Sequence, residues 1–236
     1  MEQPKQASAA RPIGIALIVY AIGFNIPYTW LGINFDYPAI LRAPPGEILA
    51  RFAAQGDAIV FAWAAFMAAA LLLAPVAVGV ARVTRRRGDM SQAIAAIGVA
   101  AAIAQAIGLS RWVYAVPGLA ASWAQGDVAQ AEAGFLLLHQ FAGVGVGEAI
   151  GQTLTAFWLI GVALGQRGDQ RYGAAVAWVG LAAGVVLLLG LVEGLATVLH
   201  FDPGLFGLAA LVGFLLLTVW MIWTGILCIR GRGATA

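Results

Sequence analysis

Residues 173–199 form the stretch GAAVAWVGLAAGVVLLLGLVEGLATVL, in which Glu193 is the only ionisable side chain. A helix needs about 20 mostly apolar residues to cross the roughly 30 Å hydrocarbon core of a bilayer. This stretch is therefore long enough and apolar enough to span a membrane as one helix. Its apolar residues are continuous rather than alternating, which excludes a strand of a membrane β-barrel.

Five further segments have the same character, and the six together predict an all-α fold, a polytopic membrane helix bundle that forms a single domain over residues 1–236. The composition agrees, because 62% of the residues are hydrophobic, 10% are charged and the mean hydropathy is +0.90. Soluble proteins carry about 25% charged residues, so a cytosolic enzyme and a secreted domain are excluded. The predicted spans are residues 12–32, 58–81, 91–115, 142–165, 173–199 and 205–229.

The distribution of basic residues predicts the orientation. Six spans place both termini on one side of the membrane, and ten of the 13 basic residues fall on that side. Lys and Arg are enriched on the cytoplasmic side, so we expect a bacterial inner (plasma) membrane protein with both termini cytoplasmic. The arginine run needs no nucleic-acid partner to explain it. The ten residues are Lys5, Arg11, Arg82, Arg85, Arg86, Arg87, Arg167, Arg171, Arg230 and Arg232.

Eight of the 11 acidic residues fall on the opposite, outer side or in the outer half of a span. The two outer loops that follow the first and third spans are also the longer ones. Glu47–Gly56 and Ala120–Leu138 have the pattern of short amphipathic helices, which we expect to lie on the outer surface of the membrane. The informative chemistry is therefore predicted on the outer side.

Two glutamates fall inside predicted spans. Glu148 begins a polar stripe with Gln152 and Thr155 at helical spacing, and Glu193 has the same spacing to Thr197 and His200. At 1.5 Å per residue, both glutamates lie roughly 8–11 Å outward of the bilayer midplane. Buried carboxylates in a membrane must face the bundle interior. Five further polar residues of the predicted layer, at compatible depths, are Arg111, Gln105, Asn25, Tyr28 and Asp57.

Three interpretations of this layer remain open. In the first, Arg111 pairs with one or both glutamates and the layer is structural. In the second, the layer lines a pocket in which Glu148 and Glu193 are candidate catalytic acids or bases. The other polar residues would then bind a ligand: Arg111, Gln152, Gln105, Asn25, Tyr28 and His200. In the third, the layer is part of an ion or proton path, although the polar stripe ends near mid-membrane.

No cofactor is predicted. His139 and His200 are the only histidines, and neither has the spacing to another ligand that a zinc or haem site uses. On a continuous α-helix, His139 would lie on the side opposite Glu148. The nearby triple Gly143, Gly147 and Gly151 predicts a close contact with another helix.

The stretch from Arg111 to Pro117 and the stretch from Gly143 to Gly151 resemble a broad bacterial family of six-helix membrane proteins, domain of unknown function number 4386. The resemblance implies the fold and a fourth helix that contains a Gly-Glu pair, and it implies no activity. In the family a His often follows this glutamate, whereas this chain has Ala149.

The sequence thus predicts an integral membrane protein with an outward-facing polar pocket. The expected ligand is a small amphiphile, such as a lipid, an isoprenoid or a quinone, which the protein binds and in one interpretation transforms; whether it is an enzyme stays open. One alternative is a non-catalytic subunit that docks a partner complex. Another is a small transporter. The expected partners are the lipid bilayer and a membrane protein partner or a second copy of the chain.

Overall fold

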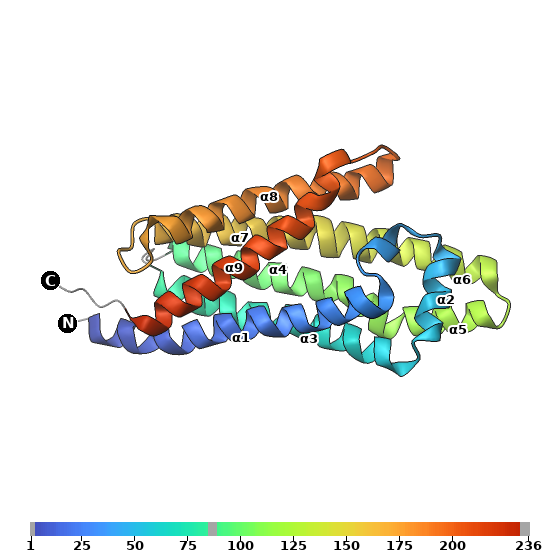
Figure 1. The fold of residues 1–236 in the computed structure, drawn as a ribbon, viewed down its shortest axis with the longest axis horizontal. Helices are drawn as coiled ribbons and strands as arrows, with labels where there is room; N and C mark the ends of the chain where they lie inside the picture. Colours follow the sequence, from blue (N-terminus) through green and yellow to red (C-terminus); the bar gives the residue numbers. More distant parts are fainter. Residues whose placement is uncertain (1–2, 85–88, 232–236) are drawn as a thin grey trace.

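The computed structural model describes residues 3–84 and 89–231 and is all-α there (Figure 1). Six helical stretches are long and apolar enough to cross a membrane, which confirms the predicted fold class. Arg85, Arg86, Arg87 and Arg232 lie outside the described residues. The elements are α1 (Gln3–Phe35), η1 (Ala39–Arg42), α2 (Pro45–Ala54), α3 (Asp57–Val83), α4 (Asp89–Tyr114), α5 (Val116–Ala124), α6 (Val128–Leu138), η2 (His139–Ile150), α7 (Gly151–Gln166), α8 (Gly173–Leu199), η3 (Gly204–Leu208) and α9 (Ala209–Arg230).

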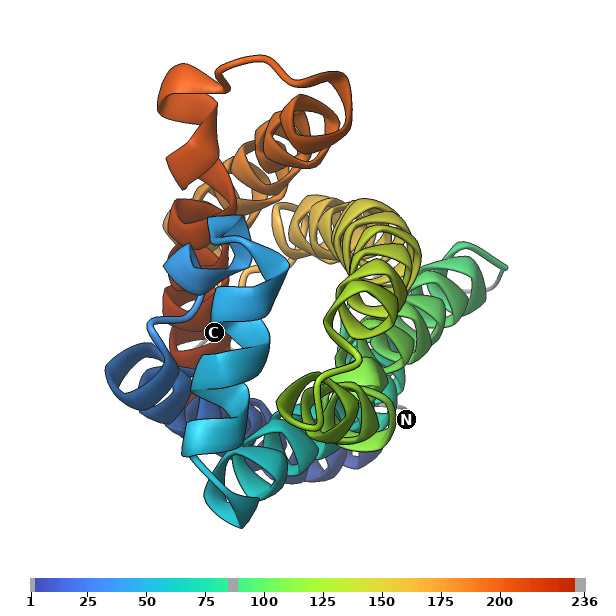
Figure 2. The same ribbon diagram turned by 90° about the vertical axis from the view of Figure 1, so that its right-hand side faces the viewer.

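The six long helices form a closed ring. Each packs on the next in the order α1, α3, α4, α7, α8 and α9, and α9 packs back on α1 (Figure 2). The start of α1 and the end of α9 lie at one end of the bundle, which we call the terminal end (Figure 1). The opposite end carries α2, α5 and α6, and we call it the capped end.

The two long membrane helices before and after residues 125–127 extend beyond a bilayer at the capped end. The apolar stretch Asp89–Ala124 has 36 residues and Val128–Gln166 has 39. At 1.5 Å per residue each exceeds about 50 Å, against roughly 30 Å of hydrocarbon. The short helix predicted over Ala120–Leu138 is not continuous, because α5 ends at Ala124, α6 begins at Val128 and a turn separates them. The prediction over Glu47–Gly56 matches α2.

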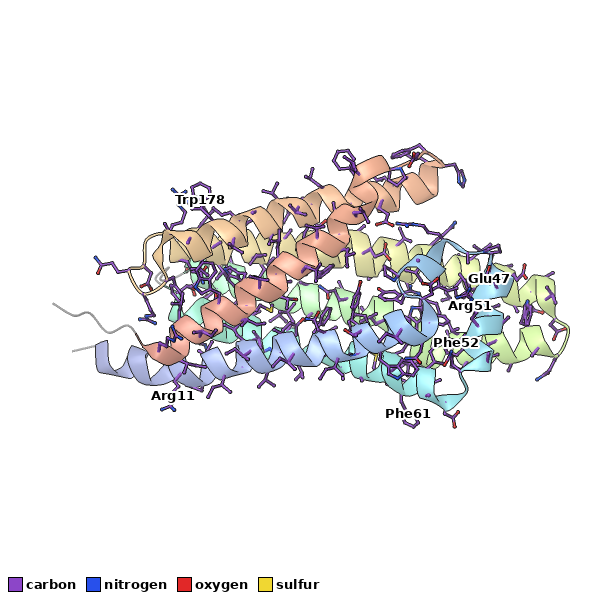
Figure 3. All side chains as sticks on the ribbon, viewed as in Figure 1. Arg11, Glu47, Arg51, Phe52, Phe61 and Trp178 are labelled. Carbon is purple, nitrogen blue, oxygen red and sulfur yellow. The ribbon has the colours of Figure 1, made fainter. Side chains whose placement is uncertain are left out.

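Large apolar side chains form the outside of the ring. Phe61 on α3 is 74% exposed and Trp178 on α8 is 56% exposed, and both point away from the bundle (Figure 3). Inside, the buried apolar residues form two clusters, one toward the terminal end around Trp158 and Trp220 and one at the capped end around Trp63 and Trp112. A surface of this kind suits lipid as the solvent.

Candidate functional site

A cavity of about 120 Å³ lies within the ring, and α1, α3, α4, η2, α7 and α9 all contribute to its wall. Six of the eight predicted site residues line it, which are Asn25, Tyr28, Gln105, Arg111, Glu148 and Gln152. The other lining residues are Phe24, Tyr37, Phe66, Gly108, Leu109, Trp112, Gly143, Gly147, Leu211, Phe214, Leu215 and Thr218.

The segment that carries Glu148 is a π-helix, η2, rather than part of an α-helix. The π-helix has i→i+5 hydrogen bonds and is rare, and π-helical turns are frequent at functional sites. A turn of a π-helix holds more residues than a turn of an α-helix, so different residues lie on the same side of the helix. The expectation that His139 lies opposite Glu148 applied to a continuous α-helix, and this segment is not one. His139 contacts Arg111, and Glu148 lines the cavity with Arg111.

Glycines bring η2 against α4, as the glycine triple predicted. A Cβ built on Gly108 would lie 2.6 Å from the Cα of Gly147, and one built on Gly151 would lie 2.9 Å from the Gln105 side chain. A Cβ on Gly143 would lie 2.6 Å from the Arg111 Nη2 atom. Residues without side chains are therefore required here, both for the backbone approach and for the place of the Arg111 guanidinium.

Arg111 is 7% exposed and is held by three neighbours. Its Nη1 donates to the carbonyl oxygen of Gly108, its Nη2 lies 3.4 Å from His139 Nδ1, and its Cζ lies 5.1 Å from the centre of the Trp112 ring. These contacts orient the guanidinium along the α4 and η2 wall. His139 in turn stacks on Phe135 with ring centres 5.5 Å apart.

Glu148 has a different environment from the one that the structural interpretation predicted. Among the described residues its carboxylate makes no ion pair and accepts no hydrogen bond, although its charge and that of Arg111 attract each other through space. Arg111 and Glu148 thus form no direct ion pair in the described residues, and the structural interpretation of the whole layer stays a prediction. A half-buried carboxylate without a partner is costly in a membrane protein. Glu148 is therefore the strongest candidate in this wall for a functional residue.

Glu193 and His200 lie outside the cavity wall. Glu193 on α8 forms an ion pair with Arg42, the last residue of η1. His200 ends α8 in the left-handed conformation with φ 56° and is exposed. Equal depth in the membrane did not place these side chains, because the rotation of α8 directs them elsewhere.

The Arg42–Glu193 pair is exposed, with 62% and 28% of the two side chains accessible. Exposed ion pairs contribute about 0–1 kcal/mol. We expect Glu193→Gln to lower the free energy of unfolding by less than about 1 kcal/mol, and Arg42→Gln to have an equally small effect. The measurement is the unfolding midpoint in detergent, and a loss of several kcal/mol for either variant would show that the pair supports the fold.

Tyr37 was missed from the sequence because it lies in the loop between α1 and η1, outside every predicted span. It lines the cavity and packs edge-on against Tyr28 with ring centres 5.6 Å apart. Burial raises the pKa of the Tyr37 phenol, and the negative charge of Glu148 adds to that effect. The hydroxyl therefore stays protonated at neutral pH. The sequence offered one indication, because Tyr37 closely follows the predicted span 12–32, which has Tyr28 and Trp30 near its end.

The sequence profile of a family described as domain of unknown function (DUF4386) matches residues 13–225. The chain belongs to this family. No curated protein and no solved structure matches the chain at a significant level.

Every residue of the cavity wall lies inside the part of the chain that matches the DUF4386 family. Among the described residues, no three His, Cys, Asp or Glu side chains come close enough together to hold a metal ion. The cavity wall instead offers one carboxylate, one guanidinium, three amides and several aromatic rings. Such a set suits hydrogen bonding and charge recognition of an organic group.

Proposed function

We propose that this protein binds the polar head of a small amphiphile in the cavity around Glu148. The observation that carries the proposal is the amphipathic wall. Polar side chains of α1, α4, η2 and α7 line the cavity together with apolar side chains, among them Leu211, Phe214 and Leu215 of α9. A molecule with a polar head and an apolar tail matches both kinds of side chain.

The α9 side of the wall reaches the lipid-facing surface of the bundle. Leu215 lines the cavity and is 52% exposed, and it shares an exposed face of α9 with Val212 and Val219. At the terminal end α1 and α9 approach closely, since a Cβ on Gly14 would lie 2.5 Å from the Gly225 carbonyl oxygen. Figure 1 shows the two helices diverging toward the capped end. We infer that the amphiphile enters between them from the bilayer.

We further propose that the capped end faces outward from a bacterial inner membrane. The basic residues Arg82, Arg167 and Arg230 lie where α3, α7 and α9 end, at the terminal end. The positive-inside rule then places the terminal end, and both termini, in the cytoplasm. The cavity would open in the outer half of the membrane, where it would take ligand from the outer leaflet.

We also propose a catalytic role for Glu148. A carboxylate that faces a cavity and has no protein partner is free to accept a proton from a bound ligand. In that case the protein would transform its amphiphile, with Glu148 as the general base. Glu193 is not part of this proposal, because it lies outside the wall and pairs with Arg42.

Native mass spectrometry of the gently solubilised protein tests the proposal. We expect a discrete adduct of lipid-like mass on the wild type and none on Glu148→Gln. The control is Glu47→Gln, which makes the same change on an exposed residue of α2 (Figure 3) and should keep the adduct. An adduct that persists on Glu148→Gln would contradict binding at this cavity. A second protein bound in fixed proportion, without an adduct, would favour the docking subunit instead.

A further inference from the structure

The side-chain amides of the cavity wall donate to the protein through their nitrogens. Asn25 Nδ2 donates to Ala21 O at 2.7 Å and to Thr218 at 3.1 Å, and Gln152 Nε2 donates to Leu187 O at 2.6 Å. A carbonyl oxygen can only accept, so these bonds fix which end of each amide is the nitrogen. The oxygens of the two amides accept no hydrogen bond among the described residues and are left for an occupant of the cavity, as is the second N–H of Gln152.

The side-chain amide of Gln105 also donates to the protein through its nitrogen, in this case to a threonine hydroxyl. Its Nε2 lies 2.6 Å from Thr155 Oγ1, and Thr155 Oγ1 lies 2.7 Å from the carbonyl oxygen of Gly151. The threonine hydroxyl gives its single proton to Gly151, so it accepts from Gln105. The Gln105 oxygen accepts no hydrogen bond among the described residues and lies on a wall residue of the cavity.

The cavity thus presents acceptors to a ligand. Three amide oxygens and the Glu148 carboxylate have no donor among the described residues. The wall also holds N–H groups beyond those used in these bonds, one each on Gln105 and Gln152 and the remaining ones of the Arg111 guanidinium. Two donors in the wall, Arg111 Nε and Trp112 Nε1, also lack a partner, but neighbouring atoms cover both of them completely. An occupant cannot reach them. The hydroxyls of Tyr28 and Tyr37 can donate or accept and so adapt to either kind of ligand.

Aromatic rings surround the same space. Phe24, Tyr28, Tyr37, Phe66 and Phe214 all line the cavity. The ring centres of Phe24 and Phe66 are 4.7 Å apart, those of Tyr28 and Phe66 are 6.1 Å apart, and those of Phe24 and Phe214 are 6.2 Å apart. Rings grouped around a small space attract ammonium groups through their negative faces, and proteins recognise quaternary ammonium ligands in this way.

We propose that the group bound in this cavity is an ammonium group, held by the Glu148 carboxylate, the three amide oxygens and the aromatic rings. The inference rests on the proposed binding of an amphiphile and names its head group. The volume of about 120 Å³ limits the enclosed group to one somewhat smaller than the occupant of the roughly 150 Å³ cavity that binds benzene. A primary or methylated ammonium with its adjoining carbons fills such a space, and the apolar chain would pass Leu215.

The Arg111 charge selects among amines. Its guanidinium is turned toward Gly108, His139 and Trp112 and does not pair with Glu148. It would repel a bare cation but attract an anionic group on the same ligand. An ammonium that adjoins a phosphate, as in a zwitterionic phosphoethanolamine or phosphocholine head group, satisfies both charges of the wall.

The test compares ligands that differ only in the head group, on the full-length protein in detergent. Three probes are titrated by native mass spectrometry: a single-chain phosphoethanolamine lipid, a phosphoglycerol lipid with the same chain, and free phosphoethanolamine. We expect the wild type and Glu47→Gln to bind the phosphoethanolamine lipid at least about tenfold more tightly than the phosphoglycerol lipid. Glu148→Gln should lose measurable binding of the phosphoethanolamine lipid and leave the folded yield unchanged.

The outcomes separate this inference from the proposed function. Equal binding of both lipids, lost from both in Glu148→Gln, would overturn the ammonium assignment and leave amphiphile binding in place. Binding that is the same in the wild type and Glu148→Gln for every probe would overturn both. Free phosphoethanolamine that binds as tightly as its lipid would support the ammonium site and identify a water-soluble amine as the source.

Discussion

Gly108→Ala should lower the free energy of unfolding by about 3 kcal/mol, at the upper end of what a single added methyl group costs in a packed interior. The new Cβ would lie 2.6 Å from Gly147 Cα and 3.1 Å from the Ala142 carbonyl oxygen. Both neighbours are backbone atoms of η2, so no side-chain rotation relieves the clash and the two helices must separate. The measurement is the thermal midpoint of the purified protein in detergent.

The matched control is Gly23→Ala on α1, where a Cβ would meet no atom within 4 Å. The same methyl group should there be neutral or stabilise the helix by up to about 1 kcal/mol, since alanine favours helices more than glycine does. Equal midpoints for the two variants would show that α4 and η2 are not in close backbone contact. Loss of the adduct in Gly108→Ala alone would show that this contact also shapes the cavity.

Arg111→Leu should also destabilise the protein by about 3 kcal/mol, or roughly 5–10 °C in the thermal midpoint. The substitution removes the hydrogen bond to Gly108, the contact with His139 and the stacking on Trp112. It also removes a positive charge that attracts the Glu148 carboxylate through space, which makes that carboxylate more costly to keep in the wall.

A second substitution tests that cause. If the Glu148 charge accounts for the cost, Arg111→Leu combined with Glu148→Gln should recover part of the lost stability. Arg51→Leu is the control, because Arg51 is 48% exposed and pairs with Glu47 and Asp36 at the surface. It should cost less than about 1 kcal/mol. A midpoint for Arg111→Leu as high as that of the control would contradict the buried electrostatic role.

The spans could be predicted from hydropathy because each helix must cross the same thickness of hydrocarbon. The depth of the polar residues in the membrane could also be predicted from the sequence. It grouped Asn25, Gln105 and Glu148, and these three residues do line one cavity. Depth says nothing of rotation about the helix axis. Glu193 has the right depth and still lies outside the wall, because α8 directs it toward Arg42.

Two features had no signal in the pattern of apolar residues. Tyr37 reaches the cavity from a loop, whose course depends on tertiary packing rather than on periodicity. The π-helix of η2 differs from an α-helix by hydrogen-bond register, and its glycines and valines satisfy both kinds of helix. The side on which His139 lies was therefore predicted for the wrong helix geometry.

Because η2 joins α6 to α7, deletion of a single residue from η2 would change how α6 is rotated relative to α7. Residues of an α-helix follow one another at about 100° around the axis. The turns of the π-helix η2 hold more residues, so removal of one residue from it would turn α6 by somewhat less than that angle relative to α7. Phe135, whose ring centre lies 5.7 Å from that of Trp112, would swing away from the bundle together with His139. The number of residues in η2, more than their identity, sets the direction in which the two halves of the helix face.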